Sequence, residues 1–440
     1  MISVHELRQT IAESQTLGTD IPVERKDYFS WLNQAASNHL IKAIVGFRRS
    51  GKSFLLKMLS QSLMNKGVPH TNIFYLNFEN DLLKEVKTVR QLRQIWEMYQ
   101  REVANIHKPI FVLWDEVQLV QNWEKLVRTI YEQGKYNIFI SGSNSKLLSG
   151  EFSSSLSGRS LSLEIKPFSF REYLDFLNIN FKDYYSQKQH IDKAFTFYLH
   201  RGGMCEQFKL PELLARNYHE GIVQKIILDD IIKRYQVDNV NVLKETFEFV
   251  RGNVTSPLSL RKIVGRLEEQ GMKVSATTIE NYLRYWMSTY AIEKLTKFDF
   301  KLGRVFARTA KYYLVDNSFI SGREDADEKR LENLVYHELT RKYGRENVFF
   351  GQNENGYEVD FIVNKEGKFL CFQVCLRLTG ENSKREFGNL ELAKKHLGGD
   401  GIVLYVDSAL PTPSPELPAR SPSLRSGVSG RAQPVIEWLL

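Results

Sequence analysis

The segment GFRRSGKS, residues 46–53, constrains the fold of this chain more than any other feature. It fits the pattern G-x-x-x-x-G-K-[ST], in which a glycine-rich turn joins a buried strand to a helix and presents backbone N–H groups to phosphates. The residues before it, 42–46, are apolar and β-branched, as a buried strand should be. The residues after it place apolar side chains at helical spacing as far as Gly67. The flanking sequence therefore favours a strand, a phosphate-binding loop and a helix over a glycine turn without a ligand.

Each position of this loop has an expected role in binding a nucleoside triphosphate. Glycines at both ends let the backbone N–H groups face the phosphates. Lys52 is expected to reach the β- and γ-phosphates with its ammonium group, and the Ser53 hydroxyl is expected to hold Mg²⁺. The predicted nucleotide contacts in the loop are Gly46, Phe47, Arg48, Arg49, Ser50, Gly51, Lys52 and Ser53.

A second motif, PIFVLWDEVQ at residues 109–118, supplies the acidic residues that such a loop needs. Residues 110–114 are apolar and predict a strand, and Asp115 follows at its carboxyl end. Asp115 is the candidate Mg²⁺ ligand, and Glu116 is the candidate base that orients and deprotonates water. The alternative for this acidic pair is a helix cap. Because a glycine loop lies upstream, the pair favours a catalytic site.

A third strand is predicted in YNIFISGSNSKLL, residues 136–148, and it ends in small polar residues. Either Ser143 or Asn144 could contact the γ-phosphate or the attacking water. Ser, Gly and Asn are also ordinary turn residues, so a simple turn is an equal alternative. The sequence leaves both interpretations open.

Two further strands are predicted at residues 73–80 and at about 161–165. Arg159 just precedes the second of them. It could complete a γ-phosphate site, either in its own chain or from a neighbouring subunit of a homo-oligomer. An arginine at such a position is equally often a solvated surface residue.

These strands alternate with helical segments over residues 1–174, a pattern that predicts an α/β fold with a parallel sheet covered by helices on both faces. Ligands of such sheets bind beyond the carboxyl ends of the strands. Gly46, Asp115 and Ser143 all fall at those ends. Three independent motifs thus predict one nucleotide-binding P-loop domain.

The chain resembles a family of prokaryotic AAA-type ATPases with a C-terminal domain of unknown function, in the segments GFRRSGKSFLL, LWDEVQLVQNWEKLVRTI, ISGSNSKLLSGE and LSGRSLSLEIKPFSFREYL. The similarity extends to about residue 407 and includes the final EWLL. The resemblance implies ATP binding and hydrolysis, and it implies little about the cellular role. Phe47 stands where the family often has proline, which should not disturb phosphate contacts made by the backbone.

Residues 175–256 predict a helical linker or lid region, and residues 257–327 follow a different pattern. Two amphipathic segments, the second with Ser275 as its expected N-cap, precede two predicted strands at 292–298 and 311–315. Helix, turn, helix and strand pair is the pattern of a winged helix.

The predicted winged helix is locally basic, with 11 Lys/Arg and 5 Asp/Glu between residues 257 and 311. Basic side chains on such an element can contact DNA phosphates, but winged helices also bind proteins, and basic faces are often only solvated. DNA and a protein therefore both remain candidate partners. The candidate phosphate contacts are Arg261, Lys262, Arg266, Lys273, Arg284 and Lys297.

Residues 328–407 predict a small α/β unit that resembles the PD-(D/E)XK nuclease fold. Asp360 matches its first carboxylate, and Glu332 stands where a helix acid belongs. The next strand reads Gln373-Val374-Cys375, where an active enzyme needs an acid and a lysine to hold Mg²⁺ and activate water. We therefore expect a degenerate nuclease-like domain that binds nucleic acid or protein.

Residues 408–440 hold a Pro/Ser-rich segment, predicted to be disordered, and an apolar end, PVIEWLL, that could dock or fray. The chain has no run of about 18 apolar residues, and its three cysteines have no zinc-type spacing. These features predict a cytoplasmic protein without a membrane partner. A net charge of +8 permits a polyanionic partner without requiring one.

Together the motifs predict an ATPase that hydrolyses ATP with Mg²⁺ and couples the cycle to DNA or protein binding by its C-terminal domains. Lys52, Glu116 and Arg159 are the predicted catalytic residues, and Ser53 and Asp115 the predicted metal ligands. Two alternatives remain: a nucleotide-controlled binding switch with negligible turnover, and an ATP-driven nuclease that uses Asp360 and Glu332.

Overall fold

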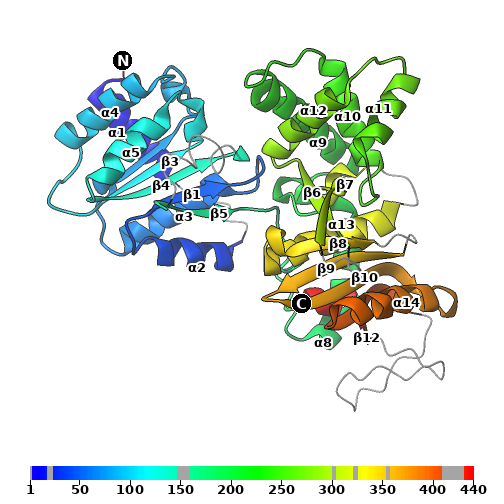
Figure 1. The fold of residues 1–440 in the computed structure, drawn as a ribbon. Helices are drawn as coiled ribbons and strands as arrows, with labels where there is room; N and C mark the ends of the chain where they lie inside the picture. Colours follow the sequence, from blue (N-terminus) through cyan, green and yellow to red (C-terminus); the bar gives the residue numbers. More distant parts are fainter. Residues whose placement is uncertain are drawn as a thin grey trace. The chain divides into compact units, whose positions relative to one another are not determined.

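The computed structural model describes residues 2–16, 23–145, 158–299, 304–320, 326–352, 357–408 and 431–440. The chain divides into two compact units (Figure 1). Unit 1 comprises Met1–Pro167 and Ser288–Tyr290, and unit 2 comprises Phe168–Met287 and Ala291–Leu440. The first division falls close to the end of the ATPase domain predicted at residue 174.

Unit 1 is built on a five-stranded sheet in the order β2-β3-β4-β1-β5, and every pair of neighbouring strands is parallel. This confirms the predicted parallel α/β fold. The strands are β1 (Ile41–Val45), β2 (Ile73–Asn77), β3 (Ile110–Asp115), β4 (Tyr136–Gly142) and β5 (Ser160–Glu164). The helices are α1 (Val4–Gln15), α2 (Lys26–Ala35), α3 (Lys52–Asn65), α4 (Val89–Glu102) and α5 (Trp123–Glu132).

The alternation of side chains along the strands explains why helices cover both faces of this sheet. Ile44, Tyr75 and Leu113 face a core that also contains leucines of α2 and α3. Phe74 points the other way and stacks on Tyr99 of α4, with ring centroids 4.0 Å apart. The strands β1, β2 and β3 are therefore buried on both faces, which fits their continuous apolar runs in the sequence.

Unit 2 contains a seven-stranded mixed sheet in the order β12-β11-β10-β9-β8-β6-β7 (Figure 1). Its strands are β6 (Ile292–Asp299), β7 (Arg304–Leu314), β8 (Val348–Gln352), β9 (Glu358–Lys365), β10 (Lys368–Leu378), β11 (Asp400–Ser408) and β12 (Arg431–Pro434). Its helices are α7 (Phe170–Phe176), α8 (Tyr184–Arg201), α9 (Glu212–Lys225), the π-helix η6 (Ile226–Ile232), α10 (Val240–Gly252), α11 (Leu260–Glu269), α12 (Ala276–Ser288), α13 (Ala326–Tyr343), α14 (Gly380–Leu397) and α15 (Val435–Leu439).

The two faces of this second sheet are covered by different helices. Phe361 and Val363 of β9 face a core shared with α7, α8, α13 and α15, whereas Ile362 between them faces a core shared with α14. The strands predicted as the wing, β6 and β7, belong to the same sheet, because β6 pairs with β8. The boundary predicted at residue 327 is therefore crossed by a continuous sheet.

The predicted apolar end docks on unit 2. Residues 431–434, which the sequence placed in or beside a disordered segment, form β12 parallel to β11. Val435, Ile436 and Leu439 of α15 are buried in the core beside α8. The rest of the predicted disordered segment, and residues 146–157 of the predicted motif block, lie outside the described residues.

Candidate nucleotide-binding site

The loop at residues 46–53 connects β1 to α3, as its sequence predicts, and two of its positions require glycine. Gly46 has a φ of 141°, and a Cβ there would lie 2.2 Å from the carbonyl oxygen of Ile165. Gly51, which precedes α3, has a φ of 99°. Side chains of L-residues rarely tolerate such backbone, so glycine fixes the shape of the loop.

A buried arginine that was not predicted from the sequence donates hydrogen bonds to this loop. Arg25 is 1% exposed and donates to the carbonyl oxygen of Ser50 at 2.8 Å and to that of Lys166 at 2.8 Å. Its guanidinium also lies over the Tyr28 ring, 4.5 Å from the centroid. Arg25 thus ties the loop to the segment that follows β5. Arg25 lies in the polar segment ERKDYF, where no sequence motif indicates a role for it.

The Lys52 side chain lies folded over the loop it belongs to. Its Nζ donates to the carbonyl oxygens of Gly46 at 3.1 Å and Phe47 at 3.0 Å. It also lies 3.6 Å from Oε1 of Glu116, at the end of the neighbouring motif. The structure therefore brings together the predicted phosphate-binding lysine and the predicted base.

Asp115, at the carboxyl end of β3, is fully buried in a network of hydroxyl groups. Ser141 Oγ donates to Oδ1, and the Tyr75 hydroxyl donates to Oδ2 at 3.3 Å. Burial and the charge of Glu116 raise the pKa of Asp115 to about 6, against the opposing hydrogen bonds from Ser141 and Ser53. Ser141 was not predicted from the sequence, although it lies in the same small-residue end of β4 as Ser143.

Glu116 has an unusual backbone and a side chain held from several directions. Its φ is 55°, in the left-handed region that non-glycine residues seldom occupy. Gln118 Nε2 donates to Oε2, and the backbone N–H of Ser143 donates to the same oxygen at 3.3 Å. Burial raises the pKa of Glu116, but Lys52 and Gln118 outweigh burial, so the pKa lies below its ordinary value. The carboxylate is thus ionised and fixed in place.

The remaining predicted loop and sensor residues lie around this centre. Ser143 and Asn144 are buried directly after β4, and Gln118 reaches the Ser143 hydroxyl at 3.4 Å. Arg48 is half-buried and pairs with Glu79 at 3.2 Å. Among the other loop residues, Phe47 and Ser50 are buried, Ser53 is half-buried, and Arg49 is exposed with a φ of 61°.

Arg159 does not lie in this centre, so of the two alternatives that the sequence leaves open, a role in its own chain finds no support in the geometry. Ser160, the first residue of β5, is paired with Ile41 at the start of β1, and the two strands run parallel. The loop follows the other end of β1, about 15 Å away at 3.3 Å per residue. Arg159 instead lies near Glu132 at the end of α5, whose pKa the hydrogen bond from Arg128 and the charges of Arg128 and Arg159 lower. The sequence places Arg159 just before this strand, and the parallel pairing of β5 with β1 shows which edge of the sheet that is.

The residues around Asp115 fit a magnesium ion. Its carboxylate and the hydroxyl of Ser53 are hydrogen-bonded neighbours, and both are the hard oxygen ligands that Mg²⁺ prefers. Mg²⁺ commonly takes one or two protein ligands and completes its shell with water and substrate phosphates. Within the described part of the chain, no three His, Cys, Asp or Glu side chains are grouped to hold a metal.

The predicted nuclease-like residues of unit 2 surround a lysine instead of an open acidic site. Lys311 of β7 is 1% exposed, and its Nζ lies 2.9 Å from Glu332, 2.8 Å from Glu358 and 3.9 Å from Asp360. Burial lowers the pKa of Lys311, but these carboxylates outweigh it and hold the pKa above its ordinary value. The sequence did not indicate Lys311, because it lies in a strand assigned to the wing.

The second expected departure from a nuclease, at Gln373 and Cys375, is also seen in the structure. The Gln373 side chain accepts from the backbone N–H of Asp360 at 2.8 Å and donates to Glu386 at 2.8 Å. Burial raises the pKa of the Cys375 thiol to about 12, so it stays protonated. Gln373 therefore serves as a hydrogen-bonding bridge, and neither residue supplies the charge that metal-dependent cleavage needs.

Within the described ranges, no helix is long and apolar enough to cross a lipid bilayer.

Comparison with known proteins identifies the domain that contains the loop. Residues 38–174 match the family model described as the AAA domain. Residues 192–329 match a second model, described as a domain of unknown function (DUF8612). Among solved structures, a Walker-type ATPase of Pyrococcus abyssi aligns with a TM-score of 0.46 and 13% identity, over 68% of this chain and 95% of that one. The Aeropyrum pernix ORC1 protein, in complex with DNA, aligns with a TM-score of 0.31 and 12% identity, over 72% and 94%.

Two relatives share most of the chain. An uncharacterized protein of Haemophilus influenzae is 33% identical over 361 residues, which cover 81% of this chain and 87% of that protein. An uncharacterized protein of Methanocaldococcus jannaschii is 32% identical over 377 residues, which cover 83% and 81%. The chain therefore belongs to the same family as these two proteins, and its AAA domain, with the phosphate-binding loop at 46–53, makes it a nucleotide-binding protein of the AAA ATPase type.

Proposed function

We propose that this chain binds ATP with Mg²⁺ at the loop 46–53, hydrolyses it, and uses the cycle to change how unit 2 engages DNA. One observation carries the proposal. The loop, Lys52, Asp115 and Glu116 converge at the carboxyl ends of β1 and β3, where ligands of parallel sheets bind. A phosphate chain on the loop would meet the ammonium of Lys52 on one side and the two carboxylates on the other.

The pair between Lys52 and Glu116 suggests how binding prepares the base. The ammonium of Lys52 can pair either with the carboxylate of Glu116, at 3.6 Å, or with the phosphates of a bound nucleotide. When Lys52 turns to the phosphates, Glu116 loses the positive charge that lowers its pKa and becomes more basic. Gln118 and the Ser143 N–H keep its carboxylate oriented toward the attacking water.

Asp115 and Ser53 would hold the magnesium ion, which when bound neutralises charge on the phosphate oxygens. Lys52 would stabilise the charge that develops on the γ-phosphoryl group. Arg159 cannot reach that group in its own chain, so we assign it to the site of a neighbouring subunit. The protein would then act as a homo-oligomer with shared sites.

Substitution of Glu116 by Gln tests the catalytic assignment. We expect phosphate release from Mg²⁺–ATP to fall by about a hundredfold or more, because the base is lost, while ATP binding persists. Lys52→Ala should lose both, and Glu97→Gln, an exposed glutamate of α4, should change neither. Phosphate release and equilibrium ATP binding are measured on the same preparations. If the unaltered protein binds ATP tightly but shows no turnover, the protein is a binding switch and Glu116 has no catalytic role.

Unit 2 offers an element suited to DNA. Helices α10, α11 and α12 precede β6 and β7, and Leu258 forms an antiparallel bridge with Ala310 of β7, as in a winged helix. The Ser275 hydroxyl accepts from the N–H of Thr278 and starts α12 as predicted. Most of the predicted phosphate contacts are exposed: Arg261, Lys262, Arg266, Lys273 and Arg284, with Lys297 half-buried.

The DNA proposal is tested with two pairs of basic residues. The Arg261→Ala/Lys262→Ala variant removes two exposed charges from α11, and Lys394→Ala/Lys395→Ala removes two from α14. Duplex DNA should raise phosphate release, and only the first variant should weaken DNA binding. For the Arg261→Ala/Lys262→Ala variant, the slope of log affinity against log salt concentration should become shallower by about 2, one unit for each lost phosphate contact. DNA that neither binds nor stimulates at low salt would turn the search to a protein partner.

A further inference from the structure

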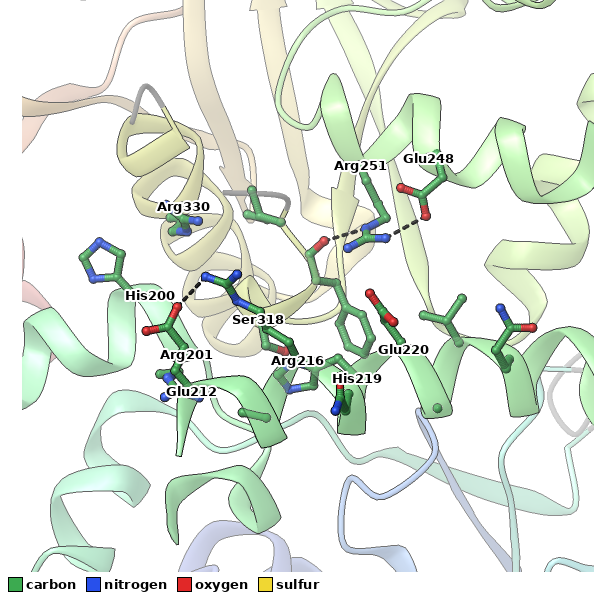
Figure 2. Close-up of a pocket in the computed structure, with 17 residues that line it drawn as sticks. His200, Arg201, Glu212, Arg216, His219, Glu220, Glu248, Arg251, Ser318 and Arg330 are labelled. Atoms are coloured by element: carbon green, nitrogen blue, oxygen red, sulfur yellow. Dashed lines mark hydrogen bonds and ion pairs between the residues drawn. The ribbon is translucent and has the colours of Figure 1, made fainter. Parts of the chain in front are cut away.

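A cavity of about 980 Å³ lies within unit 2, formed by helices α8, α9, α10 and α13 and by the turn η7 (Asn317–Phe319) (Figure 2). Cavities of this size hold ligands as large as a nucleotide. The cavity uses no residue of the loop 46–53, which belongs to unit 1. The mechanism proposed above therefore leaves it without a role.

The lining of this cavity is rich in guanidinium groups. Each of the four helices contributes one arginine: Arg201, Arg216, Arg251 and Arg330. Three of them are neutralised by ion pairs with acids on their own helix: Glu212, Glu248 and Asp327. These pairs hold the arginines in position, and Figure 2 shows the Arg216 and Arg251 pairs beside the cavity.

Arg201 differs from the other three. It ends α8, and within the described residues it makes no ion pair; its guanidinium packs over the Phe197 ring, 5.6 Å from the centroid. One uncompensated guanidinium thus faces the cavity. Glu220 of α9 also lines it and is exposed to solvent.

Two lining residues carry buried polar atoms that have no hydrogen-bond partner in the described structure. They are Nε2 of His219 and Nε of Arg330. Both residues are 8% exposed. Buried donors are almost always satisfied, so these two indicate a partner outside the protein.

His219 is placed to donate. Burial, together with the charges of Arg201 and Arg251, lowers its pKa to about 4, so the ring is neutral at neutral pH. One ring nitrogen then carries a proton and can donate it. The ring packs against Phe319, with centroids 5.4 Å apart, so an apolar wall lies beside the donors.

We propose that this cavity binds a phosphorylated small molecule of nucleotide size. Arg201, Arg330 and His219 come from three helices and offer more N–H donors than the two oxygens of a carboxylate can accept, whereas a phosphate presents three terminal oxygens. Phe319 would pack against the organic part of the ligand. His219 and Arg330 are buried and Arg201 is half-buried, which suits a free small molecule that enters the cavity better than the backbone of a nucleic acid.

The location of the cavity suggests a regulatory role for this ligand. Helix α9, which carries Arg216 and His219, runs directly into the π-helix η6. Such helices are rare and frequently lie at functional sites. A ligand held by α9 would therefore contact the element next to a backbone irregularity, in the unit that we assign to partner binding.

The test uses the full chain with Lys52→Ala, which weakens nucleotide binding at the loop, and histidines labelled with ¹³C at Cε1. The His219 resonance is assigned by its absence in His219→Gln. Pyrophosphate and adenosine 5′-monophosphate are the probes, and adenosine is the uncharged control. We expect both probes, but not adenosine, to shift the His219 resonance saturably.

Arg201→Ala should raise the Kd from this titration by about tenfold or more, while Arg377→Ala, an exposed arginine of β10 outside the cavity, should not change it. Arg201→Gln, which removes the charge but keeps a longer side chain, gives the same comparison if Arg201→Ala fails to fold. An unmoved His219 resonance at about 10 mM of either probe would overturn the proposal. So would a shift whose Kd is indifferent to both Arg201→Ala and Arg201→Gln. Loss of ATP hydrolysis alone would concern the loop site and leave this one standing.

Discussion

At the scale of single residues, the most consequential side chain outside the nucleotide site is Lys311. Its ammonium lies among Glu332, Glu358 and Asp360, where its one positive charge meets three carboxylates. Burial and the charge of Glu332 hold the pKa of Asp360 well above its ordinary value. The lysine therefore takes the charge-balancing position that a metal ion occupies in an acidic cluster.

We predict that Lys311→Met lowers the free energy of unfolding by about 3–5 kcal/mol at pH 7, because it leaves buried carboxylates without their counter-charge. Urea denaturation measures this, with Lys368→Met, at an exposed lysine of β10, as the control. Carboxyl pKa values raised in the folded state stabilise it as the pH falls, so the loss should shrink between pH 7 and pH 5. A loss of under 1 kcal/mol would show that Lys311 does not balance the cluster.

Residues that belong to a short sequence motif could be predicted from the sequence. Residues whose partners lie far away along the chain could not. Lys52, Asp115 and Glu116 could be proposed because each lies at a fixed place in a short pattern, and the structure brings the side chains of Lys52 and Glu116 within 3.6 Å. Arg25 and Lys311 could not, because their partners are 25 and 21 or more residues away and depend on tertiary packing. The charge of an isolated Arg or Lys carries no sign of what it will contact.

At the scale of elements, the order of strands and helices in unit 1 followed from periodicity, but the sheet order and register did not. The register matters most for β5, whose pairing with β1 sets Arg159 at the far end of the sheet. In unit 2, periodicity indicated β6 and β7 but not that they join the sheet of β8 to β12. Hydrogen bonding between strands that are distant in sequence leaves no local pattern.

The contact between the loop and Ile165, the residue after β5, gives a further prediction. Gly46→Ala should abolish ATP binding and lower the midpoint of thermal unfolding, because its Cβ would meet the carbonyl oxygen of Ile165 at 2.2 Å. Gly67→Ala is the matched control: its φ is also positive, at 87°, but nothing lies within 4 Å of the added Cβ. The control should cost only about 1–2 kcal/mol of left-handed strain and retain ATP binding. Equal effects of the two substitutions would contradict the proposed contact.

At the scale of the whole molecule, the position of Arg159 predicts that catalysis needs more than one copy of the chain. Lys52→Ala and Arg159→Ala should each lose ATP hydrolysis alone, whereas a mixture should recover a substantial part of it. In the mixture, an intact loop from one chain meets an intact arginine from another. Phosphate release per chain should also rise with protein concentration. Activity that is independent of concentration, and not restored by mixing, would remove Arg159 from catalysis.

The core of unit 2 has a consequence for how the chain is made in the cell. Helices α7 and α8 are buried against α15, so Phe170 and Leu199 share a core with Val435 and Leu439. At a synthesis rate of about 5–20 residues per second, roughly 10–50 s would pass between the synthesis of α8 and that of α15, which packs in the same core. During that interval the apolar face of α8 is exposed to other nascent chains. Production of this protein should therefore depend on chaperones that shield apolar surface, more than its charge and composition would suggest.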